Sequence, residues 1–323
     1  MSALAICVNP MSGRDVRRLA ARATNMTHEA KRDIVARVAA GADAVGVSEL
    51  FVTREPFRIA SAALEHMNLT AKVNVLDLPI SNDAGDTERA IEAFVQRGCT
   101  TVVSLGGDGT NRAIVRRFPD LDLVPLSTGT NNVFPQIVEP TVAGMVAGLV
   151  AVGRVSAADG LAAPVKVLHV QLGDGRTDVG LIDAVLLSDD HVGNLLPFDS
   201  GRLRQILLTR AEPDAIGMSP IGGYLDVVEA SDDCGLLLEM GAGQSFTAPL
   251  SPGLFREVSV ASFSRIPFDM PVLFPAPGVL ALDGDRDHKL TGAGARVSVR
   301  RDGPRVFDIA RTMRFAVREG MIG

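Results

Sequence analysis

Short apolar runs alternate with helical patterns through the first 150 residues of the chain. Runs such as Leu4–Val8 and Thr101–Leu105 are apolar throughout, which is typical of parallel strands covered on both faces. Between them, Asp86–Arg97 has helical spacing, with Asp86 or Thr87 as a suitable N-cap and Gly98 as a stop. This alternation predicts an α/β domain with a parallel sheet. Further strands are predicted over Glu49–Val52, Lys72–Leu76 and Leu123–Leu126, and further helices over Asp15–Arg22, Asn111–Arg117 and Thr141–Ala151.

The pattern changes in the second half of the chain to strands separated by turns. Helical spacing is scarce there, apart from Arg202–Thr209 and the final stretch Ile309–Arg318. The pattern predicts a β-rich second domain. We place the domains at residues 1–138 and 139–302, followed by a C-terminal segment, 303–323. The predicted strands are Val165–Leu172, Val179–Leu187, Leu236–Met240, Glu257–Ala261, Val279–Leu282 and Arg296–Val299.

Composition narrows the class of protein. A net charge of −6 and an aromatic fraction of 4% lack the basic footprint and stacking aromatics of nucleic-acid binders, so we expect no nucleic-acid partner. The isolated cysteines Cys7, Cys99 and Cys234 argue against a disulfide framework or a zinc site. The start of the chain does not resemble a signal peptide, and the apolar stretch Val142–Val152 is far shorter than the ~20 residues that span a bilayer. We therefore expect a cytoplasmic protein with no membrane partner.

The strongest chemical signal is the glycine-rich loop Gly106–Thr110, which joins a predicted strand to a predicted helix. Glycines let polyphosphate approach the backbone N–H groups, and a helix N-terminus adds positive potential. A carboxylate at Asp108 is costly beside phosphates unless it binds Mg²⁺ or accepts a proton from an attacking hydroxyl. The alternative is an ordinary glycine-rich turn in which Asp108 caps the helix.

Two more polar, glycine-containing loops follow predicted strands. Asn9–Gly13 follows the first strand, and Thr128–Asn132 follows the strand over Leu123–Leu126. Ligands of parallel sheets bind beyond the carboxyl ends of the strands, so all three loops can share one crevice. Three such loops by chance are much less probable than one, and a phosphate-binding site is favoured over a cap.

The trio Asn9-Pro-x-Ser-Gly13, Gly106-Gly-Asp-Gly-Thr110 and Thr128-Gly-Thr-x-Asn132 resembles the superfamily of NAD kinases and diacylglycerol-type lipid kinases. Within it, the chain looks most like the acetoin-catabolism protein X group, often labelled ATP-NAD kinase-like. The resemblance covers almost the whole chain. It implies an N-terminal α/β domain, a β-sandwich-like C-terminal domain and a last segment that returns to the first domain. It also implies ATP and Mg²⁺ as cofactors.

The resemblance further implies which residues form the site. Asp108 would bind Mg²⁺ or act as the base. Asp283 and Asp285, which resemble the family's Asp-Gly-Glu element, would complete the catalytic site across the cleft. The alternative for that pair is a solvated turn. The residues implied in nucleotide binding are Asn9, Ser12, Gly13, Gly106, Gly107, Gly109, Thr110, Thr128, Gly129, Thr130, Asn131 and Asn132.

Departures from the family patterns bear on the acceptor. Arg112 and Ala113 stand where lipid kinases typically have Asn-Glu, and Val133 replaces a typical Asp. The Asn-x-Gly-x-Leu-Gly-Phe pattern of NAD kinases is also absent. We therefore expect ATP-dependent phosphoryl transfer to a hydroxyl of a small soluble metabolite. An NAD kinase and a regulatory protein that binds ATP without turnover are the alternatives, and the oligomeric state, homo-oligomers included, stays open.

Two further features have open interpretations. Asp183 lies in an apolar strand, where an unpaired carboxylate is costly, so it either faces the cleft or is satisfied by local hydrogen bonds. The glycine-containing stretch Met218–Tyr224 is either part of the acceptor site or a simple loop.

Overall fold

The apolar runs of the first half of the chain form a parallel sheet, as predicted. The computed structural model describes residues 2–14 and 25–322, and it orders these strands β3-β2-β1-β4-β5-β17-β6. All neighbours pair in parallel except β17 and β6, which are antiparallel. The strands are β1 Ala3–Val8, β2 Glu49–Thr53, β3 Lys72–Leu76, β4 Thr101–Gly106, β5 Asp122–Ser127, β6 Ala162–Pro164 and β17 Arg305–Phe307. The helix predicted over Asp15–Arg22 lies outside the described residues.

Helices cover both faces of this sheet. One core cluster joins the sheet to α2, α3, α6 and α8, and a second joins its other face to α4 and α5. The helices are α2 His28–Ala44, α3 Ile59–Leu64, α4 Ala84–Gln96, α5 Asp108–Arg117, α6 Pro140–Ala151 and α8 Ile309–Arg318. Asp83, and not the predicted Asp86 or Thr87, caps α4, because its side chain accepts the Gly85 N–H.

The second domain is the predicted β-rich unit, built from two antiparallel sheets. Their strand orders are β12-β11-β10-β9-β14-β15 and β13-β16-β7-β8, and Leu168, Phe274, Leu280 and Val297 are in the core cluster that the two sheets share. The strands are β7 Val167–Leu172, β8 Thr177–Gly180, β9 Asp183–Leu187, β10 Leu203–Leu208, β11 Cys234–Ser251, β12 Leu254–Pro267, β13 Val272–Phe274, β14 Gly278–Leu282, β15 Asp285–Leu290 and β16 Ala295–Arg300. Its short helices are α7 Ser219–Gly223 and the 3₁₀ turn Ser200–Arg202, and a further 3₁₀ turn, Ala157–Asp159, precedes β6 of the first domain.

The helix predicted over Arg202–Thr209 is wrong. This segment forms strand β10, which pairs with β9 on one side and β11 on the other. Its apolar residues Leu203 and Ile206–Leu208 are all buried, because apolar clusters cover both faces of this central strand. A short apolar segment that is buried on both faces shows no hydrophobic periodicity, so its sequence does not distinguish a helix from a strand.

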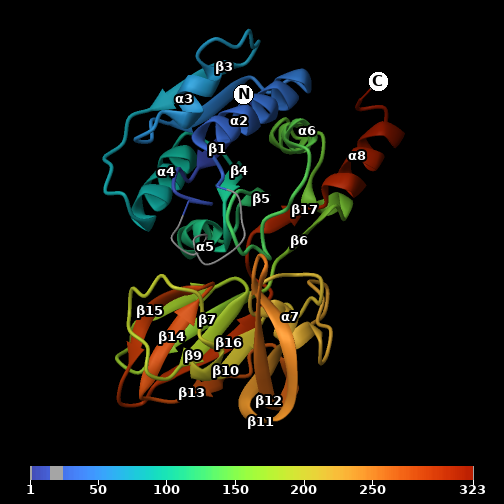
Figure 1. Ribbon diagram of the computed structural model, residues 1–323. Coiled ribbons are helices and arrows are strands. Elements are labelled where there is room, and N and C mark those ends of the chain that lie inside the picture. Colours follow the sequence, from blue (N-terminus) through green and yellow to red (C-terminus); the bar gives the residue numbers. More distant parts are fainter. Residues whose placement is uncertain (1, 15–24, 323) are drawn as a thin grey trace.

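The chain passes between the domains twice, and the predicted boundary after residue 138 lies too early. Helix α6 packs against α2, and β6 joins the parallel sheet, so both belong to the first domain. After the second domain, β17 and α8 return to the first, where Figure 1 shows α8 in red near α6. The two connections are hydrogen bonded to each other, since the Val165 N–H donates to Pro304 O and the Gly303 N–H to Val165 O, both at 3.1 Å.

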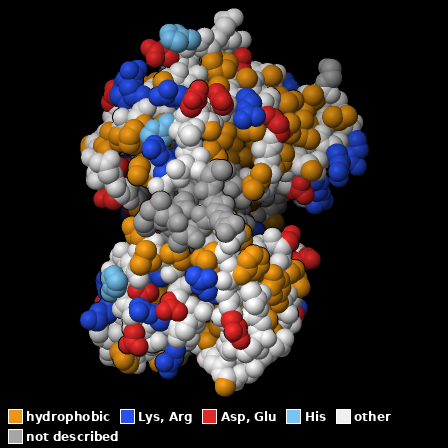
Figure 2. Space-filling view, viewed as in Figure 1, with side chains coloured by type: hydrophobic (Ala, Val, Ile, Leu, Met, Phe, Trp, Pro, Cys, Tyr) orange, Lys and Arg blue, Asp and Glu red, His pale blue; other side chains and the backbone are white. Residues whose placement is uncertain are grey.

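None of the described helices combines the length and apolar character needed to cross a bilayer. On the face shown in Figure 2, acidic and basic side chains are interspersed on both domains.

Helix α5 connects the first domain to the second through its charged face. Asp108, Arg112 and Arg116 are four residues apart and share one side of the helix. Arg112 is 5% exposed and donates to Leu282 O at 3.0 Å and to Asp287 Oδ2 at 2.5 Å. Arg116 pairs with Asp178 at 2.9 Å. The carboxylates of the second domain are thus neutralised by a helix of the first.

Arg112→Met should therefore destabilise the protein strongly. Removing one partner of a buried ion pair typically costs about 3–5 kcal/mol, because the other charge stays buried without compensation. We expect a clear fall in the thermal unfolding temperature. The matched control is Arg117→Met, whose arginine is 52% exposed and 3.8 Å from Glu92; it should change stability by less than about 1 kcal/mol. Equal effects of the two substitutions would contradict the role assigned to Arg112.

Candidate functional site

Three loops of the first domain meet beyond the carboxyl ends of β1, β4 and β5, which are adjacent in the sheet. Asn9 Nδ2 donates to Thr110 Oγ1 at 2.8 Å, and the hydroxyls of Ser12 and Thr128 are 2.7 Å apart. Buried Lys31 donates to the carbonyl oxygens of Asn9 and of the next residue, both at 2.8 Å. These bonds tie the three predicted loops into one unit.

Asp108 is the first residue of α5, but its carboxylate does not cap that helix. The N-cap is Gly107, which has no side chain. The Asp108 carboxylate accepts the N–H groups of Phe134 at 2.9 Å and Val133 at 3.1 Å. Asp108 therefore links α5 to the end of the loop that follows β5, and its interpretation as a helix cap is wrong.

A cavity of about 480 Å³ is bounded by these loops and by the second domain. This volume is within the range of small-molecule sites. Leu195, Asp283 and Asp285 are its lining residues from the second domain. The predicted site residues of the three loops that line it are Asn9, Ser12, Gly13, Gly107, Asp108, Gly109, Thr110, Gly129, Thr130, Asn131 and Asn132. The predicted residues Gly106 and Thr128 do not line it; a Cβ at Gly106 would lie 2.4 Å from Thr110 Cβ.

Sequence reasoning missed a second part of this wall. Thr53–Pro56 follows β2 and Leu78–Ile80 follows β3, and both segments line the cavity. The rule that located the three polar loops also applies to these strand ends, since both strands were predicted. Neither segment contains the glycine-rich pattern that identified the other loops as site residues.

The first turn of α5 faces the cavity without side chains at two positions. A Cβ at Gly109 would lie 2.9 Å from Asp285 Oδ2, and a Cβ at Gly107 would lie 2.8 Å from Asn132 Oδ1. The first N–H groups of a helix have no partner within the helix. An anion at this end would meet backbone N–H groups and the positive end of the helix dipole.

Asp283 lies at the turn between β14 and β15, with a left-handed φ of 51°. Its carboxylate accepts the N–H groups of Leu181 at 2.8 Å, Ile182 at 2.7 Å and Asp183 at 3.2 Å. Both oxygens are engaged by backbone, so Asp283 fixes the start of β9 beside the cavity. Asp285, two residues on, is 35% exposed and lies 3.6 Å from Arg112 Nη2.

Asp108, Asp183 and Asp283 gather into a buried cluster of carboxylates at the domain interface. Burial, followed by the charge of Asp283, raises the pKa of Asp108 to about 7. Burial and the two neighbouring carboxylates raise the pKa of Asp183 well above its usual range. Burial also raises the pKa of Asp283, against the opposing charge of Arg112. Of the two interpretations left open for Asp183, the structure favours the cleft.

A smaller cavity of about 40 Å³ shares Asp108, Asn131 and Asp283 with the larger one. Asn131 Nδ2 donates to Ser251 Oγ at 2.8 Å, which closes the contact between the domains at this point. The stretch Met218–Tyr224 contributes only Met218 to this cavity. The remaining lining residues are Val133, Asp183, Leu196, Pro197, Phe198, Ile216, Gly217, Leu250, Ser251, Gly284 and Arg286.

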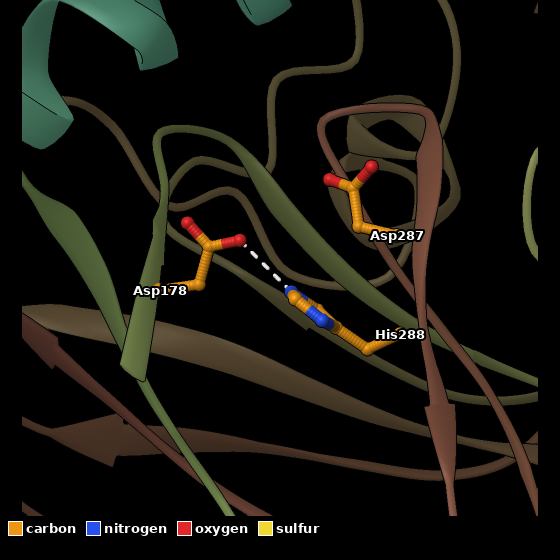
Figure 3. Close-up of side chains that lie close together, drawn as sticks. All are labelled: Asp178, Asp287 and His288. Carbon is orange, nitrogen blue, oxygen red and sulfur yellow. Dashed lines mark hydrogen bonds and ion pairs between the residues drawn. The ribbon is translucent and has the colours of Figure 1, made fainter. Parts of the chain in front are cut away.

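A third group of ionisable side chains, Asp178, Asp287 and His288, has ligand atoms within 4.8 Å of one another (Figure 3). His288 Nε2 lies 2.8 Å from Asp178 Oδ2. Arg116 pairs with Asp178 and Arg112 with Asp287, so each carboxylate already has a cation. Burial raises the pKa of Asp178, but the hydrogen bond from His288 and the charges of the two arginines outweigh it and lower this pKa to about 2. The group is an ion network between the domains, and its neutralised carboxylates are poor metal ligands.

Comparison with known proteins identifies the family. Residues 4–155 match the family model of the ATP-NAD kinase N-terminal domain, and residues 166–302 match that of the acetoin catabolism protein X C-terminal domain. The chain is 34% identical to "Acetoin catabolism protein X" of Cupriavidus necator, over 98% of this chain and 93% of that protein. The chain belongs to the acetoin catabolism protein X family.

The predicted resemblance is thereby confirmed, and at a coarse level this family member is kinase-like. Two solved structures from Bacillus anthracis str. Sterne, described as a diacylglycerol kinase and a putative diacylglycerol kinase, are also similar. They are 10% and 12% identical, have TM-scores of 0.43 and 0.45, and each match covers 96% of this chain and 98% of theirs.

In this family member, the candidate site straddles the two matched regions. The three loops and Asp108 lie within the region that matches the ATP-NAD kinase domain, whereas Asp183, Asp283 and Asp285 lie within the other.

Asp108→Asn should stabilise the protein in a pH-dependent way. Because the pKa of Asp108 is raised to about 7, the folded state loses stability as pH rises from about 4 through 7. Asparagine cannot ionise, so we expect the free energy of unfolding to increase by about 1–4 kcal/mol at pH 8 and to change little at pH 4. Unfolding measured at both pH values tests this, with Asp120→Asn, an exposed residue, as the control. A less stable Asn variant at pH 8 would contradict the electrostatic account.

Proposed function

We propose that the protein is an ATP-dependent kinase that transfers a phosphoryl group to a hydroxyl of a small metabolite. One observation carries the proposal: Asp108 forms part of the wall of both a nucleotide-sized cavity and an adjoining smaller one. A kinase needs a phosphoryl donor and an acceptor hydroxyl on either side of one proton-accepting group. The match to the ATP-NAD kinase domain supports the same chemistry.

The larger cavity would hold ATP. The loops Asn9–Gly13 and Thr128–Asn132 would bind the nucleotide, and Gly106–Thr110 would receive its phosphates at the first turn of α5. Gly107 and Gly109 support this assignment, because both line the cavity and, without side chains, leave the backbone accessible to a phosphate.

The phosphates need a counter-charge, because several carboxylates surround the place proposed for them. Carboxylate oxygens are ligands that Mg²⁺ prefers, so the donor set fits this ion. Asp285, which lies beside Gly109, would hold it, with Asp108 as the second candidate ligand. Bound Mg²⁺ would neutralise charge on the phosphates during transfer.

Asp108 would act as the base. Its carboxylate would accept the proton of the acceptor hydroxyl while that oxygen bonds to the γ-phosphorus. The bond from the γ-phosphorus to the bridging oxygen breaks, and ADP leaves. A pKa of about 7 suits a base that works near neutral pH. Asp283, predicted to be catalytic, would instead be a positioning residue, since three backbone N–H groups engage its carboxylate, against two at Asp108.

The acceptor distinguishes this proposal from its alternatives. The name of the Cupriavidus necator relative links that protein to acetoin catabolism, which supports a small metabolite here. Saturable formation of NADP from NAD would favour an NAD kinase. ATP binding without transfer to any hydroxyl would favour a regulatory protein.

ATP with Mg²⁺ should raise the thermal unfolding temperature by several degrees. A ligand at 100 times its Kd stabilises the folded state by about 2.7 kcal/mol. Gly109→Val should abolish the shift, because its Cβ would lie 2.9 Å from Asp285 Oδ2 and its methyl groups would extend into the cavity. Gly201→Ala is the matched control, since its Cβ would meet only Asp199 Oδ1 at 3.5 Å. A folded wild-type protein that shows no shift at millimolar ATP would refute nucleotide binding.

Asp108→Asn should lower kcat by ~10²–10⁴-fold and leave ATP affinity nearly unchanged. The substitution removes the proton acceptor, whereas the backbone N–H groups of the loop remain. Release of ADP with a panel of small hydroxylated metabolites measures turnover, and calorimetry measures ATP binding. Asp120→Asn should behave as wild type. Turnover of Asp108→Asn within twofold of wild type would remove Asp108 from the chemistry.

A further inference from the structure

The small cavity contains a carboxylate oxygen without a partner. Asp183 is 7% exposed, and its Oδ1 has no hydrogen-bond partner within residues 2–14 and 25–322. The backbone N–H of Gly284 is hydrogen bonded to the same carboxylate. Buried polar atoms are nearly always paired, so an unpaired one on a residue that lines a cavity calls for a ligand.

The volume of the cavity limits what it can hold. About 10–15 Å³ of such space accommodates one water molecule. A cavity of about 40 Å³ therefore takes roughly three waters, or a fragment of a few non-hydrogen atoms. Neither a dinucleotide nor an acyl chain fits there.

The charges of the residues that line the cavity disfavour anionic ligands. Asp108, Asp183 and Asp283 all line the cavity. Arg286 also lines it, but its Nε donates to Asp190 at 2.9 Å, and both side chains are 2% exposed. Its guanidinium also stacks over Phe198 at 4.4 Å. Since the arginine is already paired, the described residues that line the cavity offer an anion no free cation.

The remaining walls are largely apolar. Leu196, Phe198, Met218 and Leu250 face the same space. The cavity thus combines an acidic side, where hydroxyls find acceptors, with an apolar side that suits a short carbon skeleton.

We propose that the small cavity binds the acceptor, a short uncharged polyol, and that Asp183 selects it by accepting a hydrogen bond from a second hydroxyl at Oδ1. This inference rests on the proposed kinase function, in which the first hydroxyl meets Asp108. Asp183 would then determine specificity, because alcohols with a single hydroxyl leave its Oδ1 unpaired.

The test compares probes that differ in one group. Glycerol and propane-1,2-diol are the neutral polyols, glycerate and lactate are the corresponding anions, and propan-1-ol has a single hydroxyl. The full-length protein is compared with Asp183→Asn, Asp183→Leu and the control Asp233→Asn, whose carboxylate is 82% exposed. Three quantities are measured: ATP·Mg²⁺ affinity by calorimetry, turnover by ADP release, and probe binding without ATP by ligand-observed NMR.

We expect wild-type kcat/KM to be at least about tenfold higher for each polyol than for its anion. Asp183→Leu should lower kcat/KM for the polyols by about 10²-fold, abolish their NMR binding signal, and change turnover of propan-1-ol only slightly. Asp183→Asn should retain polyol turnover within about tenfold, because its amide oxygen accepts the same bond. ATP·Mg²⁺ affinity should stay within about twofold of wild type in both variants, since Asp183 does not line the larger cavity.

Three results would overturn the acceptor assignment while ATP·Mg²⁺ binding persists. They are equal or better turnover of the anions, an equal loss of propan-1-ol turnover in Asp183→Leu, and the absence of probe binding and turnover in wild type. Asp183→Leu also removes the acceptor of the Gly284 N–H, so its folding is checked by thermal unfolding, and Asp183→Asn keeps an acceptor there and controls for a packing defect at leucine. A wild-type protein that does not bind ATP·Mg²⁺ would instead refute the kinase proposal. In that case, polyol binding that is lost only in Asp183→Leu would still support the assignment of the small cavity to a polyol.

Discussion

The buried guanidinium of Arg112 is the interaction on which the arrangement of the site depends. It reaches from α5 of the first domain to the β14–β15 hairpin, which carries Asp283, Asp285 and Asp287 in the second. Burial of several carboxylates at one interface is unfavourable unless a cation is buried with them. Because Arg112 lies one helical turn after Asp108, the residue that joins the domains also sets the position of the candidate base relative to the second domain.

The positive charge of Arg112 does not balance all of the carboxylates at the domain interface, and this affects their chemistry. The carboxylates of Asp283 and Asp108 accept three and two backbone N–H groups, respectively, whereas Asp183 keeps one oxygen without a partner in the described residues. The pKa of Asp108 is raised because its charge is buried and stands near Asp283. The same crowding that costs folding stability above neutral pH gives a carboxylate able to accept a proton there. Stability and the proposed activity therefore oppose each other at this residue.

The sequence by itself determined the parallel sheet, the β-rich second domain and the three loops of the first. Strands covered on both faces are apolar throughout, and ligand-binding loops follow their carboxyl ends, so local patterns suffice to find both. The last helix, Ile309–Arg318, has the predicted bounds, because its apolar and charged residues recur at the spacing of an amphipathic helix. Asp108 was singled out on the same local grounds.

Only the tertiary structure decided which distant residues complete the site. Arg112 is separated from Asp287 by 175 residues and Asp183 from Asp283 by 100, and no local pattern records such contacts. Strand β10 was predicted as a helix, because a short segment buried on both faces takes its form from the strands on either side. Helix α6 and strand β6 were assigned to the wrong domain for a related reason. A sequence shows where an element begins, but it does not show which other elements its apolar face will pack against.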